Sequence, residues 1–187
     1  MSKVSQLPEA AGDVLEFWFE TLTPEQWWKQ DDDVDARIRE RFSRLYESVA
    51  RHVPEEWLAT PDGRLVAVIV LDQFPRNMFR NDARSYGSDA AALSLAKETI
   101  DMGWDAEIPP EKRAFLYMPY QHSEDAGVQA RSVELFAALG NEENLDFAKK
   151  HKEIIDRFGR FPHRNEMLGR KSTPEEEEFL KAPGLFW

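Results

Sequence analysis

The sequence contains no cysteine, and this absence removes several classes of site at once. Disulfide bonds, zinc–thiolate centres, iron–sulfur clusters and catalytic thiols all need cysteine side chains. A chain of 187 residues without them depends on its apolar core for stability. A domain of this length buries about 70% of the surface of its unfolded chain, which is enough for a core without covalent cross-links.

Long apolar runs are absent too. The longest, Leu65–Leu71, is far shorter than the ~20 residues that a membrane-spanning helix requires. The first nine residues, MSKVSQLPE, lack the apolar segment of a secretory signal. We therefore expect a cytoplasmic protein, in a reducing compartment, without a membrane partner.

Positive charge is scarce, with 24 Lys and Arg against 35 Asp and Glu and a net charge of −11. Such a surface repels phosphate backbones, so we expect no broad nucleic-acid binding. The remaining positive charge is concentrated, however. Between Arg157 and Arg170 the chain carries four arginines and only one acid, Glu166. A basic stretch in an acidic protein indicates a site for a small anion.

Helical periodicity dominates the chain. Thr23 and Thr173 are each followed by Pro and then by Gln or Glu at the third position, a pattern typical of helix starts. Another helix is expected to end before Pro119, and Ser123 is expected to cap the next one. The β-branched run Leu65–Leu71 resembles a buried strand. Because no second strand-like run exists to pair with it, we expect a buried helix there.

These patterns predict an all-α fold without a sheet. We expect about eight to ten helices, joined by short turns and stacked as antiparallel hairpins. No Gly/Ser linker or low-complexity tract divides the chain. We therefore expect one domain over residues 1–187, with residues 1–10 as a flexible start.

Three motifs carry a resemblance to a known family. They are LDQFPRN at 71–77, HSED at 122–125 and RFGRFPHRN at 157–165, followed by LGR at 168–170 and STPEE at 172–176. Together they closely resemble the bacterial family called domain of unknown function 924, from about residue 14 to residue 180. The resemblance implies an all-helical fold like the right-handed superhelix of tetratricopeptide repeats. It implies no activity, because that family is uncharacterised.

The segment around Pro75 is the first candidate site. If it is helical, Asp72, Gln73 and Arg76 share a face by steps of three and four residues. Pro75 removes one helical hydrogen bond and kinks or ends the helix, which directs Gln73, Arg76 and Asn77 to one place. Two interpretations stay open: an Asp72–Arg76 ion pair at the end of a core helix, or an Arg76 that faces a ligand.

Two histidines are candidates for acid–base chemistry. His122 lies just before a helix start, where the positive end of the helix dipole disfavours its protonation. A neutral histidine can act as a general base or a ligand, although a structural role at the helix start is the simpler interpretation. His163 and Arg164 project from a loop between core positions. His151 lies on an apolar stripe, which is typical of a core histidine.

The candidate ligand-binding residues are Asp72, Gln73, Arg76, Asn77, His122, Glu124, Arg157, Arg160, His163, Arg164 and Asn165. We predict that they bind a small anionic ligand, with a phosphate or a carboxylate held by arginines. One alternative is a repeat-like module that clamps the carboxylate of a peptide. Another is a hydrolase or transferase that uses His122 and His163 as acid–base groups, so the sequence leaves open whether the protein is an enzyme.

No cofactor or metal is predicted. The sequence has neither a glycine-rich phosphate loop nor a dinucleotide-binding fingerprint, and its histidines lack the spacing of metal ligands. The aromatic end, Leu185-Phe186-Trp187, is expected to pack on the domain itself or on a second subunit of a homodimer.

Overall fold

The computed structural model describes residues 7–182. Within that range the chain contains no β-strand, and the predicted all-α fold is confirmed. The expectations for Leu185–Trp187, and part of that for residues 1–10, lie outside the described residues. In chain order the elements are α1 (Glu9–Leu15), η1 (Glu16–Thr21), α2 (Pro24–Trp28), α3 (Asp32–Arg51), α4 (Glu55–Leu58), α5 (Pro61–Val68), η2 (Ile69–Gln73), α6 (Phe74–Met78), η3 (Ala83–Tyr86), α7 (Asp89–Asp101), η4 (Trp104–Glu107), α8 (Pro110–Gln121), α9 (Ala126–Leu139), α10 (Glu142–Phe158), η5 (Pro162–Arg164) and α11 (Pro174–Leu180).

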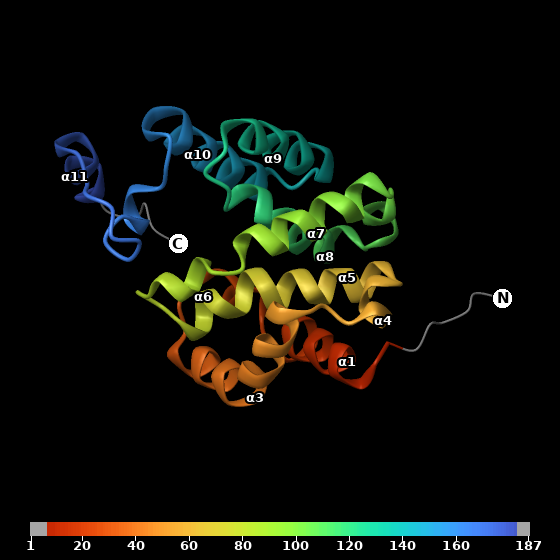
Figure 1. The fold of residues 1–187 in the computed structure, drawn as a ribbon. Helices are drawn as coiled ribbons and strands as arrows, with labels where there is room; N and C mark the ends of the chain where they lie inside the picture. The colour runs from red at the N-terminus through yellow and green to blue at the C-terminus, as the bar shows by residue number, and fades with distance from the viewer. Residues whose placement is uncertain (1–6, 183–187) are drawn as a thin grey trace.

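The helices form a stack with α5 near its middle (Figure 1). Helix α3 packs on α6 at one end, α7 and α8 pack on α5, and α9 and α10 cover α8 at the other end. Because η2 joins α5 and α6 into one helix, the eleven α-helical segments of the described residues make ten helices, within the expected range. The handedness and repeat-like character of the stack stay predictions.

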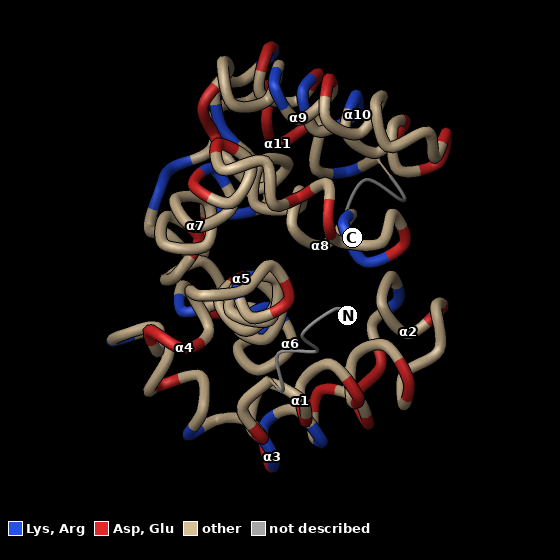
Figure 2. Tube along the Cα trace, turned by 90° about the vertical axis from the view of Figure 1, so that its right-hand side faces the viewer, with Lys and Arg blue, Asp and Glu red and all other residues tan. Residues whose placement is uncertain are grey.

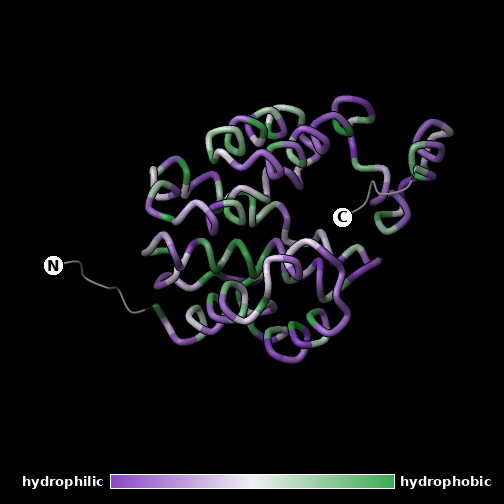
Figure 3. The backbone as a smooth tube through the Cα atoms, turned by 180° about the vertical axis from the view of Figure 1, so that it is seen from behind, coloured by the Kyte–Doolittle hydropathy of each residue, from purple (hydrophilic) through white to green (hydrophobic). Residues whose placement is uncertain are grey.

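The run that resembled a strand is the central helix. Residues 65–70 have no solvent exposure, and Leu71 is 1% exposed. They form the hydrophobic middle of the molecule (Figure 3), whereas charged residues are frequent on the outer helices α3 and α10 (Figure 2). The prediction of a buried helix is therefore confirmed. No helix within residues 7–182 is both long enough and apolar enough to cross a bilayer.

Pro75 shapes the C-terminal part of this central helix. It has no N–H, so the carbonyl of Leu71 loses its helical partner. The hydroxyl of Ser88, at the start of α7, donates to that carbonyl at 2.6 Å instead. Just before Pro75 the helix widens to a π-helical turn, in which the N–H of Phe74 donates to Ile69. Such turns are frequent at functional sites.

Two helix boundaries differ from expectation around residue 120. Helix α8 continues through Pro119 to Gln121, because its residues from Ala114 onward are all buried and their packing outweighs the cost of the proline. The cap of α9 is Asp125 rather than Ser123. The carboxylate of Asp125 accepts the N–H of Val128 at 2.8 Å, whereas the Ser123 hydroxyl accepts the N–H of Asp125 at 3.2 Å. The prediction of a Ser123 cap is wrong by two residues.

The described residues contain two separate apolar clusters. The larger one fills the stack from α1 to α10 and includes most of the large buried side chains. The smaller one consists of Ile154, Ile155 and Phe161, with Phe158 and Phe179 packed against it. Helix α11 thus packs on a small core of its own at the end of α10.

Gly63 lies where the backbones of α4 and α5 approach most closely. A Cβ atom at this position would lie 2.3 Å from the Trp57 carbonyl oxygen and 2.8 Å from its Cα. We expect Gly63→Ala to lower the free energy of unfolding by about 2 kcal/mol, because backbone atoms must move. Urea denaturation measures this change.

Gly12→Ala in α1 is the matched control, because nothing lies within 4 Å of its Cβ position. This substitution should stabilise the protein by up to about 1 kcal/mol through helix propensity. Equal effects of the two substitutions would contradict the close approach of α4 and α5.

Candidate functional site

Asp72 is the centre of the polar site. It lies in the π-helical turn η2 and has no solvent exposure. Its carboxylate accepts hydrogen bonds from His122 Nδ1 at 2.7 Å and from Gln73 Nε2 at 2.6 Å, and Arg76 Nη1 lies 3.5 Å away. Burial raises the pKa of Asp72, but His122 and Arg76 outweigh this effect and lower the pKa to about 2. Asp72 is therefore a buried, ionised carboxylate.

His122 joins the end of α8 to this carboxylate. The prediction that it lies just before a helix start is wrong, because α8 continues to Gln121 and His122 is its C-cap. Burial and the positive charge of Arg76 hold the pKa of His122 below its usual value, against the opposite effect of Asp72. At neutral pH the imidazole is therefore neutral. Since an ionised carboxylate can only accept a hydrogen bond, Nδ1 carries the proton and Nε2 carries the lone pair. The side chain is 13% exposed, so the site is close to the surface.

Arg76 connects the central helix to α7. Its Nη1 and Nη2 donate to the two carboxylate oxygens of Asp89 at 2.8 and 2.9 Å, and Nη1 also donates to the carbonyl of Asp72 at 2.7 Å. Burial lowers the pKa of Arg76, but the negative charges of Asp72 and Asp89 outweigh this effect. The net result is a raised pKa. The Asp72–Arg76 ion pair, one of the two interpretations that the sequence left open, is present at 3.5 Å.

Arg164 enters the same place from η5. Its side chain is only 8% exposed and lies between the rings of Tyr86 and Phe161, with its guanidinium carbon 4.5 and 4.6 Å from their centroids. Nη2 donates to the carbonyl of His122 at 3.0 Å, and Nη1 to Asp89 at 3.4 Å. Its Nε–H is buried and has no hydrogen-bond partner. Burial lowers the pKa of Arg164 to about 10, so the side chain stays charged at neutral pH.

Two further histidines adjoin these groups. The rings of His122 and His151 are 6.4 Å apart, and Phe161 lies 5.6 Å from both His151 and His163. Burial is the main cause that lowers the pKa of His151 to about 3 and that of His163 to about 4, and the charge of Arg164 adds to both shifts. Both histidines are neutral at pH 7.

We name these side chains the Asp72 cluster. Its members are Asp72, Gln73, Arg76, Asp89, His122, His163 and Arg164. At neutral pH the charges of its two carboxylates and two guanidiniums cancel. One added negative charge would therefore be uncompensated unless a histidine took up a proton.

Several residues predicted for the site lie elsewhere. Asn77 turns to the opposite side of α6, where its amide donates to Asp35 of α3 at 2.8 Å and Arg80 pairs with the same carboxylate. Arg157 is exposed and pairs with Glu175 at 2.8 Å. Neither Asn77 nor Arg157 therefore belongs to the Asp72 cluster.

Arg160 and Asn165 fasten α11 to the loop after α10. Arg160 donates to both carboxylate oxygens of Glu176 at 2.7 and 2.8 Å, and Asn165 donates to Glu176 at 3.3 Å. Glu124 is held between two Arg170 nitrogens, at 2.6 and 2.9 Å, and also accepts the N–H of Phe161. Glu124 lies near the cluster, but its hydrogen bonds give it a structural role there.

The sequence analysis did not identify Asp89 and Tyr86. Asp89 is 13 residues from Arg76 and belongs to no recognisable motif, so only the fold reveals the pair. Among the described residues no group of three or more His, Asp or Glu side chains is placed to hold a metal ion.

Comparison with known proteins agrees with the motifs. The family model described as "Bacterial protein of unknown function (DUF924)" matches residues 14–184. A solved structure, that of the protein of unknown function ATU0120 from Agrobacterium tumefaciens, matches with a TM-score of 0.87 and 38% sequence identity. The match covers 92% of this chain and 97% of that one. No curated protein matches the chain.

The low pKa of His151 makes the fold sensitive to mild acid. Because its folded pKa of about 3 lies below the usual 6.5, the unfolded chain takes up a proton that the folded chain does not. The free energy of unfolding is then highest above pH 6.5 and falls by about 1.4 kcal/mol per pH unit as the pH decreases toward 3. Urea denaturation at a series of pH values should show a shallower slope for His151→Gln than for the unsubstituted protein.

His52→Gln is the control, because His52 is exposed at the end of α3. Its slope should equal that of the unsubstituted protein, and an unchanged slope in His151→Gln would contradict the assignment.

Proposed function

We propose a function from the chemistry of the Asp72 cluster, since this chain belongs to the DUF924 family of bacterial proteins of unknown function. The protein binds a small anion, a phosphate or a carboxylate group, beside His122. The observation that carries this proposal is the unpaired Nε–H of the buried Arg164. A buried donor without a partner costs about 1–3 kcal/mol, more when it is charged. Because Nε itself is buried, a ligand oxygen can accept this N–H only after a neighbouring group moves aside, and it would then remove that cost.

The charge of the cluster supports the same proposal. After burial, the charges of Arg164 and Arg76 are the largest causes that lower the pKa of His163, and the opposite effect of Glu124 is smaller. The two guanidiniums therefore make the potential at His163 positive. An anion placed there gains this potential and also favours protonation of His122, which balances the added charge.

The donors are held in place before any ligand arrives. Asp89 fixes Arg76 through two hydrogen bonds, and the rings of Tyr86 and Phe161 hold Arg164 between them. Fixed donors lose little conformational entropy on binding. Arg157 and Arg160 are not included in the proposal, because Glu175 and Glu176 already neutralise them.

The same geometry supports an acid–base role for His122 as a second candidate function. A carboxylate that accepts the Nδ1 proton orients an imidazole and leaves Nε2 to take a proton from a substrate. The distance of 2.7 Å between His122 Nδ1 and Asp72 Oδ1 favours this role. A hydrolase or transferase that acts on a phosphate or carboxylate compound would use both features of the cluster.

Titration with inorganic phosphate or acetate, followed by calorimetry, tests the proposal. We expect Arg164→Lys to weaken binding at least about 10-fold, because it keeps the charge but removes the Nε–H and the forked geometry. Binding should tighten as the pH falls, since a protonated His122 pairs with the anion. Circular dichroism checks that the variant is folded.

Arg157→Gln is the matched control, because Arg157 is exposed and lies outside the cluster. Phosphate also stabilises proteins without a specific site, so the comparison of Arg164→Lys with Arg157→Gln decides the outcome. Equal affinity of the two variants, or no saturable binding of either anion, would overturn the proposal.

A further inference from the structure

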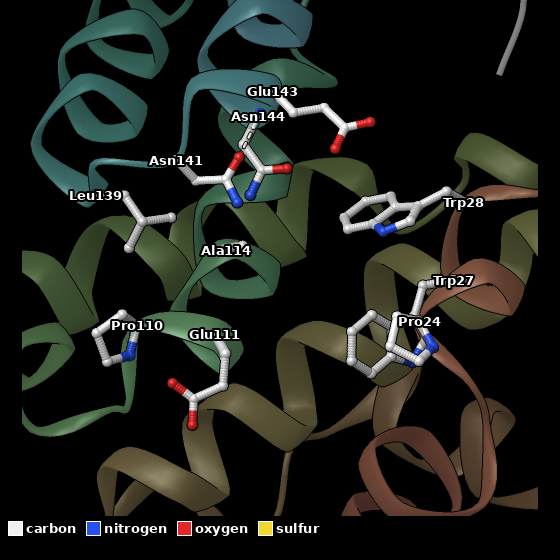
Figure 4. Close-up of a pocket in the computed structure, with 10 residues that line it drawn as sticks. All are labelled: Pro24, Trp27, Trp28, Pro110, Glu111, Ala114, Leu139, Asn141, Glu143 and Asn144. Atoms are coloured by element: carbon white, nitrogen blue, oxygen red, sulfur yellow. Dashed lines mark hydrogen bonds between the residues drawn. The ribbon is translucent and has the colours of Figure 1, made fainter.

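A hollow lies away from the Asp72 cluster, between α2, the start of α8 and the turn from α9 to α10 (Figure 4). Its volume is about 430 Å³, within the range of small-molecule sites. The residues that line it are Pro24, Trp27, Trp28, Pro110, Glu111, Ala114, Leu139, Asn141, Glu143 and Asn144. Glu111 lies in the first turn of α8, and His122 follows its last residue. The offset of eleven residues between these positions corresponds to about 16 Å along the helix axis, so the two sites are distinct.

Two tryptophans form the aromatic walls of the hollow. Their rings are 6.4 Å apart and nearly perpendicular, at 88°. Trp27 is fixed, because its indole N–H donates to the carbonyl of Trp18 at 2.7 Å. Trp28 stacks on the buried Phe115 at 5.5 Å and 8°, yet 46% of it is exposed to solvent. Both indoles extend into the hollow from the α2 side (Figure 4).

Two carboxylates give the hollow its charge. Glu143 extends toward Trp28 from the first turn of α10, and Glu111 lies beside Pro110 at the other edge (Figure 4). Neither has an ion pair or a side-chain hydrogen bond to another described residue. The lining contains no Lys, Arg or His. Lys112, the next residue along α8, lies over the ring of Phe19 instead. The lining therefore carries two uncompensated negative charges.

We propose that this hollow binds a small organic cation with a methylated ammonium group. Perpendicular indole rings attract such a cation through their electron-rich faces, and they do so best when it is weakly hydrated. Glu111 and Glu143 supply the opposite charge, and the two prolines and Leu139 contact the methyl groups. Asn141 Oδ1 already accepts the backbone N–H of Asn144 at 2.9 Å as the cap of α10. Its NH2 group and the amide of Asn144 remain to bind a polar group on the same ligand.

Choline and its uncharged carbon analogue, 3,3-dimethylbutan-1-ol, test this proposal directly, because they share a shape and differ in charge. Titration of the full chain, followed by the indole N–H signals in NMR spectra, should show saturable binding of choline and at least 10-fold weaker binding of the alcohol. Glu143→Gln should weaken choline binding by about 3-fold to 10-fold. Trp28→Ala should weaken it at least 10-fold, while Arg164→Lys should leave it unchanged.

Glu142→Gln is the matched control, because Glu142 lies in the same turn of α10 but does not line the hollow. Its choline affinity should equal that of the unsubstituted protein. Equal binding of choline and the alcohol, equal effects of the two glutamate substitutions, or no saturable choline binding would each overturn the proposal. Glucose serves as a neutral polar probe, and tighter binding of glucose than of choline would also overturn it.

Discussion

The buried carboxylate of Asp72 is the constraint on which the arrangement around the site depends. An ionised group without solvent costs several kcal/mol unless hydrogen bonds and opposite charges surround it. His122 and Gln73 supply the hydrogen bonds, and Arg76 supplies the charge. Asp89 then fixes Arg76, and Arg164 contacts both Asp89 and the backbone of His122. Elements from η2 to η5 are thus joined by a chain of contacts that starts at this carboxylate.

Pro75 is the local cause of this arrangement. Because it cannot donate a hydrogen bond, the carbonyl of Leu71 needs another donor, which the hydroxyl of Ser88 provides. The side chain of Arg76 donates to the next carbonyl, that of Asp72. The cluster also lies where the two apolar clusters meet, since Phe161 belongs to the smaller one and contacts Arg164. Polar contacts therefore connect the stack to its C-terminal part.

Much of the fold follows from local signals in the sequence. The capping boxes at Thr23 and Thr173 predict helix starts that are present. The sequence has no strand that could pair with Leu65–Leu71, and this run is helical as predicted. The step of four residues from Asp72 to Arg76 allows the ion pair that is present, and the motifs point to the segments that carry His122 and Arg164. These features depend on residues close together in the chain, so spacing alone reveals them.

The rest depends on how distant helices pack. Asp89 has no motif, and only the approach of α7 to α6 brings it to Arg76. Arg157 and Arg160 appeared available as anion ligands, but the acidic first turn of α11 folds back and neutralises them. The central claim, that His122 is a neutral imidazole whose proton Asp72 holds on Nδ1, is tested most directly by ¹⁵N NMR of that ring at pH 7. The account predicts a protonated Nδ1 and an unprotonated Nε2. A doubly protonated ring, or a proton on Nε2 alone, would contradict it.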